Sequence, residues 1–341
     1  MSPSTRIAFV LAVLAPILVA LPARSETAEE FFKGKQISLV IGFPPGGAYD
    51  LYARAAATFL PRYLPGHPLI IAKNLPGVAG VKAANFLYGQ APRDGLTMGM
   101  ISQATALTQA LHDPAVEYDA RQFGWIGRFA SAVQVTEVWH TVPVKTIMDA
   151  TGRETVVAAT AAGSTTDMMP RLMNRLVGTK FKIIKGYNGL NGTALAMERG
   201  EVEGAYDSVD SLLFIRPDWL RDKKIAVLVQ YAQRRHPALP DTPAMVELGK
   251  SAEDKQLLAL FGSTAEVGRA ITAPPGLPAD RLAALRRAFA AMVADPAFKE
   301  ELAKRNMEFD PMTGEELQRM VTQTLDVPPA VAARGIELSR E

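Results

Sequence analysis

Cysteine is absent from this sequence of 341 residues, which excludes disulfide bonds and thiolate chemistry. Histidine is scarce: His67, His112, His140 and His236 lack the close spacing of a metal-binding pair. No G-x-S-x-G segment occurs, so the nucleophile turn of an α/β-hydrolase is not indicated. We therefore expect neither an enzyme nor a metal site nor a bound cofactor.

An excess of charge of either sign is also missing. The chain carries 37 basic and 35 acidic residues. Residues 1–25 hold two of the basic residues and no acidic one, so the rest of the chain has 35 of each sign. A balanced chain without a basic cluster gives no support for a nucleic acid as partner.

Only one long apolar run is present, and it lies at the amino end, from Ile7 to Leu21. Arg6 precedes it, and Ala23-Arg24-Ser25 places small residues where a signal peptidase reads. Pro16 interrupts the run, which is short against the roughly 20 residues of a spanning helix. We expect cleavage after Ser25 and export to the periplasm; the alternative is an uncleaved membrane anchor.

The most informative segment is 37–50. An apolar, β-branched run ends at Phe43, Pro44-Pro45-Gly46-Gly47 follows, and apolar residues at helical spacing begin at Ala48. This pattern predicts a strand, a glycine turn and a helix start, whose free N–H groups attract anions. Neither G-x-G-x-x-G nor a P-loop Gly-Lys-Ser/Thr is present. The alternative is an ordinary turn of an α/β core.

A second unit follows the same pattern. Residues 155–160 read as a strand, 161–166 as a turn and 167–176 as a helix. The hydroxyls of Ser164, Thr165 and Thr166 either cap this helix or bind a ligand. Further strands are expected at 69–72, 96–101, 181–184 and 225–229, and further helices at 81–89, at 279–294 and after Thr313. Such alternation predicts an α/β fold with parallel sheets.

Five segments together resemble the periplasmic substrate-binding proteins of tripartite tricarboxylate transporters, also called Bug receptors. The match follows the order of the chain and covers nearly all of it after the signal peptide. The motifs are Phe-Pro-x-Gly-Gly-x-x-Asp at 43–50, Asn-x-Pro-Gly-x-x-Gly at 74–80, Pro-x-Asp-Gly-x-Thr at 92–97, Gly-x-Val-(Asp/Glu)-x-x-x-Asp at 200–207 and Ala-Pro-x-Gly-x-Pro at 273–278.

The resemblance implies a two-domain periplasmic binding protein of the Venus-flytrap, type II-like kind. Each domain is expected to be a mostly parallel sheet flanked by helices, with residues 26–130 plus 233–341 in domain 1 and 131–232 in domain 2. The chain would cross between the domains twice. A small carboxylate would sit in the cleft, held by backbone N–H groups, hydroxyls and water, and a monomer would deliver it to the transporter's membrane subunits.

Two departures from the family pattern fall at the expected cleft. Asp167 stands where the family often has histidine, and the segment from Lys185 to Gly189 replaces a Tyr-x-Gly-x-x-Pro motif. We therefore expect a di- or tricarboxylate or an aromatic acid, with Tyr49, Tyr187 and Tyr206 either lining the pocket or packing. The predicted ligand-binding residues are Phe43, Pro44, Gly46, Gly47, Tyr49, Asp50, Ser102, Gln103, Gly163, Ser164, Thr165, Thr166, Tyr187 and Asp207.

Roles follow for four charged residues. Asp50 is expected to order the Gly46-Gly47 loop rather than touch an anion, and Asp207 to accept from a donor on the ligand. Arg54 and Arg171 lie one turn into their helices, where we expect ion pairs instead of a clamp on the ligand. A sensor of the same fold acting on a two-component kinase is the alternative function.

Overall fold

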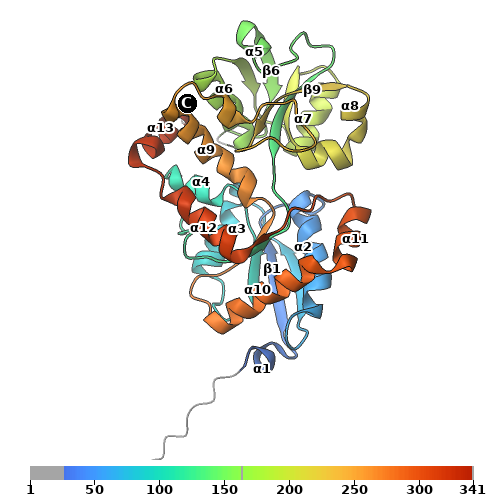
Figure 1. The fold of residues 1–341 in the computed structure, drawn as a ribbon, viewed down its shortest axis with the longest axis vertical. Coiled ribbons are helices and arrows are strands. Elements are labelled where there is room, and N and C mark those ends of the chain that lie inside the picture. The colour runs from blue at the N-terminus through green and yellow to red at the C-terminus, as the bar shows by residue number, and fades with distance from the viewer. Residues whose placement is uncertain (1–26, 163, 340–341) are drawn as a thin grey trace, which may run out of the picture.

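The computed structural model describes residues 27–162 and 164–339, so the predicted signal peptide and Gly163 lie outside the described residues. Two β-sheets form the centres of two lobes, stacked one above the other in Figure 1. Within the described ranges, no helix has both the length and the apolar character needed to cross a membrane.

Lobe 1 is built on a sheet of six strands in the order β11-β4-β10-β3-β1-β2. Phe289 of α10 lies so close to the backbone of β4 that a Cβ on Gly127 would meet its ring at 2.2 Å. The strands are β1 (Gln36–Ile41), β2 (Leu69–Asn74), β3 (Thr97–Met100), β4 (Gly124–Arg128), β10 (Ala270–Ala273) and β11 (Met312–Thr313). The helices are α1 (Ala28–Phe32), α2 (Ala48–Phe59), α3 (Val81–Gly89), α4 (Thr105–Ala110), α10 (Ala279–Ala294), α11 (Pro296–Lys304) and α12 (Gly314–Leu325).

Lobe 2 is built on five strands in the order β7-β6-β8-β5-β9. The strands are β5 (Gln134–Trp139), β6 (Glu154–Ala158), β7 (Lys180–Ile184), β8 (Gly204–Ser208) and β9 (Ile225–Tyr231). The helices are α5 (Asp149–Gly152), α6 (Thr165–Leu176), α7 (Gly189–Glu198) and α8 (Pro217–Arg221), with a short π-helix at Ser211–Ile215.

The direction of the strands follows from where the chain enters each sheet. Four of the six strands in lobe 1 and four of the five in lobe 2 run the same way. The exceptions are β10, β11 and β5. Both β5 and β10 are the first strand that the chain forms after it crosses into a lobe, and each runs against its neighbouring strands β8 and β9, or β3 and β4. The α/β architecture with two flanked sheets is confirmed.

Three segments join the lobes. Residues 129–133 lead from β4 to β5, and α9 (Ala252–Val267) leads from lobe 2 back to β10. The two connections are joined where the Ala132 N–H donates to the carbonyl of Ala265 (2.9 Å). The third segment is at the carboxyl end, where α13 (Pro329–Ser339) leaves α12 and packs with α9 and α6 (Figure 1). The resemblance had implied two crossings.

Most elements expected from the sequence are present. The helices at 81–89 and 279–294 have the predicted bounds, and Thr313 starts α12 with a capping box to Glu316. The strands β4, β5 and β10 were missed. All are buried, so their sequences show no alternation of apolar and polar residues.

Candidate functional site

The loop before α2 is held by Asp50, which lies 3% exposed in the first turn of the helix. Its Oδ2 accepts from the Gly46 N–H (3.0 Å) and from Nε of Arg54 (2.9 Å). Its Oδ1 accepts from Nδ2 of Asn74 (2.9 Å), which also donates to the carbonyl of Phe43. Asp50 thus makes the contact with the Gly46-Gly47 loop that its expected ordering role requires.

The electrostatics of Asp50 agree with this role. Burial alone would raise its pKa, but the hydrogen bonds from Arg54, Gly46 and Asn74 outweigh burial and lower the pKa to about 2. The carboxylate is therefore charged at neutral pH. One expectation is corrected: the Gly46 N–H binds Asp50, so it is not available to a ligand.

The start of α2 has open space around its glycines and backbone N–H groups that are free to donate hydrogen bonds. Pro44, Gly46 and Gly47 are exposed, and a Cβ built on either glycine would meet no atom within 4 Å. Within the described residues, the N–H groups of Ala48 and Tyr49 have no hydrogen-bond partner, as expected for the first turn of a helix. A small anion has room to approach here.

The floor beside this loop is aromatic and polar. Tyr49 stacks on Phe43 with the ring centroids 4.0 Å apart. Its hydroxyl contacts Oε1 of Gln103 (3.2 Å) and accepts from the Gln103 N–H (3.0 Å). Ser102 is buried, and its hydroxyl accepts from the Ala104 N–H. The structure thus brings the lobe 1 residues of the prediction together, with Ser102 bracing the turn after β3.

The loop before α6 uses its hydroxyls internally. The Ser164 hydroxyl donates to the carbonyl of Ala161 (2.7 Å) and lies 2.7 Å from Oγ1 of Thr166, which accepts from the Thr160 N–H. The hydroxyl of Thr165 shares a hydrogen bond with Tyr206. These contacts brace the turn itself, and the helix receives no side-chain cap from Ser164.

The helices α2 and α6 begin with the same charged pair. Asp50 and Asp167 are each the third residue of their helix, and each binds the arginine four residues on. The Nε–Oδ2 distance from Arg54 is 2.9 Å, and the Nη2–Oδ2 distance from Arg171 is 2.6 Å. The expected ion pairs of Arg54 and Arg171 are confirmed.

Asp207 corrects a second expectation. Its carboxylate is 1% exposed and takes hydrogen bonds from the hydroxyl of Ser211 (3.1 Å) and from Nη1 of Arg216 (3.1 Å). Burial raises its pKa to about 6, against the opposing charge of Arg216. Burial, followed by the nearby charge of Asp207, also raises the pKa of the fully buried Glu137. Asp207 therefore belongs to a charged cluster inside lobe 2. Consecutive residues of a strand point to opposite faces of the sheet, so Asp207 lies on the other face of β8 from Tyr206.

The tyrosines divide between packing and the site. Tyr187 is half-buried and packs against the apolar cluster behind β8. Tyr206 is buried and stacks on Tyr231 at 5.5 Å. Burial, followed by the nearby Tyr49 of lobe 1, raises the pKa of Tyr206, while the hydrogen bond with Thr165 lowers it. Tyr206 therefore lies where the two lobes meet.

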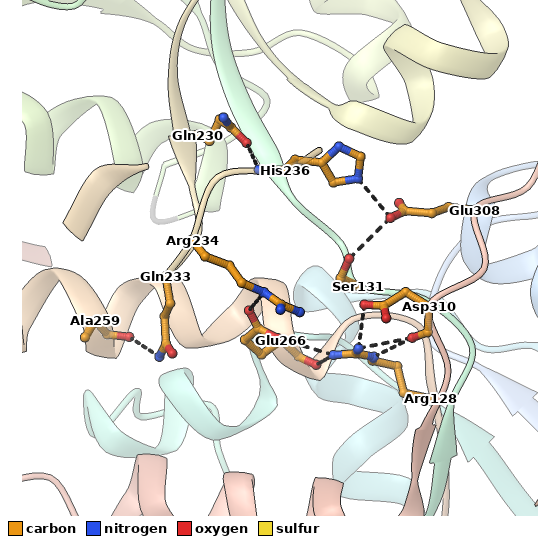
Figure 2. Close-up of polar contacts among 10 residues, drawn as sticks. All are labelled: Arg128, Ser131, Gln230, Gln233, Arg234, His236, Ala259, Glu266, Glu308 and Asp310. Atoms are coloured by element: carbon orange, nitrogen blue, oxygen red, sulfur yellow. Dashed lines mark hydrogen bonds and ion pairs between the residues drawn. The ribbon is translucent and has the colours of Figure 1, made fainter. Parts of the chain in front are cut away.

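Sequence reasoning missed the polar network between the lobes. Figure 2 shows the Glu308 side chain between the hydroxyl of Ser131, on the first connection, and the ring of His236, after β9. Burial raises the pKa of Glu308, and the hydrogen bonds from His236 and Asp210 outweigh this and lower it. Burial also raises the pKa of Asp210 to about 7. Only scattered polar residues mark this network in the sequence.

Arg128, at the end of β4, makes further polar contacts near this network. It is 2% exposed and donates to the Glu266 carbonyl, and its Nη2 lies 2.7 Å from Oδ2 of Asp310 (Figure 2). Arg234 reaches the same Glu266 at 3.8 Å. The guanidinium of Arg128 therefore fixes the end of α9 to the segment before β11.

One hollow on the surface does not coincide with these loops. It measures about 530 Å³ and lies between α10 and the start of α12, lined by Phe289, Arg286 and Gly314 among others. Its lining is mainly apolar, and it contains none of the loop N–H groups described above. The candidate site is therefore defined by the loops at the starts of α2 and α6.

The chain is similar to known proteins in both sequence and structure. Residues 53–332 match the model of the tripartite tricarboxylate transporter family receptor. A Cupriavidus necator relative, the UPF0065 protein in the gbd 5' region, is 24% identical over 92% of this chain and 91% of its own length. The structure of the periplasmic binding protein BugD superposes with a TM-score of 0.66 at 19% identity, covering 90% of this chain and 98% of that one. The R. palustris protein Rpa4515, determined with adipate, gives a TM-score of 0.65 at 22% identity, covering 89% and 97%.

Proposed function

This chain belongs to the family of tripartite tricarboxylate transporter receptors, and we propose that it binds a dicarboxylate between its two lobes and delivers it to the membrane subunits of such a transporter. It works in the periplasm as a monomer, after cleavage behind Ser25. We assign residues 131–232 to the second domain, against which α13 from the carboxyl end also packs. The adipate held by the relative Rpa4515 supports a linear diacid as the ligand.

One observation carries the proposal: both lobes present the start of a helix whose first-turn aspartate already pairs with an arginine of the same helix. The Asp50–Arg54 and Asp167–Arg171 pairs occupy the side-chain charges of α2 and α6. The partial positive charge of each first turn then remains for an anion. Two such ends bind the two carboxylates of a diacid without an arginine clamp.

The donors are the backbone N–H groups that the loops leave available. In lobe 1 these are the N–H groups of Gly47, Ala48 and Tyr49, with the Gly46 N–H reserved for Asp50. In lobe 2 they are the N–H groups of Thr165 and Thr166, helped by water. Tyr49 and Gln103 form the floor between the two ends and set the length of the acid that fits.

The first test is a thermal-shift screen of the mature protein against mono-, di- and tricarboxylates and aromatic acids. A ligand that binds only the folded state raises the melting temperature by mass action. We expect linear dicarboxylates to give the largest shift. No shift with any acid, in protein that is folded by circular dichroism, would refute the proposed function.

The second test separates backbone recognition from an ionic clamp. Gly47 has φ −86° and open space around it, so Gly47→Val is compatible with the fold and places its methyl groups in front of α2. We expect this variant to abolish binding. Arg54→Gln and Arg171→Gln should each weaken binding less than about tenfold, or about 1.4 kcal/mol. A loss of several hundredfold from either arginine variant would establish a clamp instead.

A further inference from the structure

Arg269 is a buried cation at the junction of the two lobes that the function described so far does not use. It is 4% exposed and lies between α9 and β10. Its N–H donates to the carbonyl of Ala130 and its carbonyl accepts from the N–H of Phe129, both at 2.9 Å. These bonds fix its backbone against the first connection between the lobes.

On the lobe 1 side, the guanidinium contacts two residues of the candidate site. Its Nη1 donates to Oε1 of Gln103 (3.1 Å), and its Cζ lies 4.4 Å from the centre of the Tyr49 ring. Tyr49 and Gln103 contact each other as well. The three side chains therefore form one closed group at the start of α2, and Arg269 is the member that holds the other two together.

On the lobe 2 side, Arg269 reaches Asp210, which follows β8. The Nη2–Oδ2 distance is 3.4 Å, long for a hydrogen bond between charged groups. Asp210 also shares a hydrogen bond with Glu308. Within the described chain, Nε of Arg269 has no hydrogen-bond partner. A buried guanidinium with these contacts is incompletely compensated, because burying a charge is costly unless it is paired and hydrogen-bonded.

We propose that Arg269 is a positioning residue for the carboxylate site: it holds Tyr49 and Gln103 in place, links them to Asp210 of lobe 2, and favours an anion beside them. The proposal rests on the proposed function. It differs from a clamp, since Arg269 acts through Tyr49 and Gln103. A negative ligand supplies the charge that Asp210 compensates only in part, so diacids should gain more than their half-amides.

The test compares wild type with Arg269→Met and Arg269→Lys. Arg62→Met is the matched control, because Arg62 also lies over an aromatic ring (Phe59, 4.2 Å) but is exposed at the surface. The first measurement is amide hydrogen exchange without ligand over 46–52 and 101–107. We expect faster exchange in both segments for Arg269→Met and no change for Arg62→Met. Unchanged exchange in Arg269→Met would overturn the positioning role.

The second measurement is the affinity for whichever acid the screen identifies and for its half-amide. Arg269→Met should lose roughly 10- to 100-fold for the diacid, the range of a hydrogen bond to a charged group, and clearly less for the half-amide. The affinity of Arg269→Lys for the diacid should lie between the affinities of wild type and Arg269→Met. This variant provides the measurement if Arg269→Met does not fold. Equal losses for both ligands, or none, would overturn the proposal.

The two measurements also separate the proposals. If wild type binds no acid, the proposed receptor function fails, while the exchange measurement still decides whether Arg269 positions Tyr49 and Gln103. If wild type binds an acid and the Arg269 variants bind it equally well with unchanged exchange, only the inference about Arg269 is wrong.

Discussion

Replacing Asp50 by asparagine tests how the first loop is held. In the wild type, Oδ2 accepts from the Gly46 N–H and Nε of Arg54, and Oδ1 accepts from Asn74. In Asp50→Asn, one of these positions becomes an NH₂ group that faces a donor. The Asn74 amide cannot turn to accept, because its Nδ2 also donates to Phe43 and its Oδ1 accepts from Arg54.

The magnitude follows from the lowered pKa of Asp50. A folded-state pKa of about 2, against an ordinary value near 4, corresponds to roughly 2–3 kcal/mol of stability at pH 7. Arg54 is half exposed, so solvent screens part of this, and we expect a loss of about 2 kcal/mol. Because the pKa is lowered on folding, this contribution is present above pH 4 and disappears as the pH falls toward 2.

The assay is denaturant unfolding of wild type and Asp50→Asn at pH 7, 5 and 3, followed by circular dichroism. The difference in the free energy of unfolding between the two proteins should be largest at pH 7 and smaller at pH 3. Asp280→Asn is the control, since Asp280 is exposed in the first turn of α10 and should change stability by less than about 0.5 kcal/mol. An Asp50→Asn protein as stable as wild type at pH 7, with unchanged ligand affinity, would refute the role given to Asp50.

Three further predictions concern stability alone. Gly268→Ala should cost more than about 3 kcal/mol in urea unfolding, because Gly268 has φ +55° and its Cβ would lie 2.1 Å from the Ala130 oxygen, whereas Gly89→Ala meets open space and should be tolerated. Asp210→Asn should gain up to about 3 kcal/mol of stability relative to wild type as the pH rises from 5 to 7, and little more above pH 7. Folding raises the pKa of Asp210 from near 4 to about 7, so the wild type loses stability across this interval, and equal pH profiles for the two proteins would contradict this. Glu137→Gln should melt within a few degrees of wild type at pH 7, because burial already favours the neutral acid, and a collapse of stability would show that the charged form is needed.

The fold was predictable where local signals were strong. Proline and glycine boundaries with helical periodicity gave α3 and α10 their bounds, and the capping box at Thr313 gave the start of α12. The strands β4, β5 and β10 were not found. They are short and buried on both faces, and two of them enter a sheet after the chain has crossed between lobes, which no local pattern encodes.

The candidate site likewise contains some features that local sequence patterns predict and others that they do not. The loops at 43–50 and 164–166 follow from short-range spacing, as does the ion pairing of Arg54 and Arg171, so sequence reasoning reached them; their partners Asp50 and Asp167 come from the structure. Arg269 lies 166 positions from Gln103 along the chain and 59 from Asp210, and nothing near it in the sequence indicates its contacts. Asp207 was misplaced because strand alternation decides which face a side chain takes, and its phase was not known.

The carboxyl-terminal helix sets a mechanical limit on how far the lobes can separate. α12 packs on β4 of lobe 1, while Val331 and Leu338 of α13 share an apolar cluster with α6 of lobe 2. Only residues 326–328 join the two helices, and three extended residues span about 10 Å. This short connection limits the motion of the lobes. A rotation that moved the α13 side of lobe 2 more than about 10 Å away from α12 would have to break the packing of α13 on α6. The helix α6 begins at the second of the two proposed ligand loops.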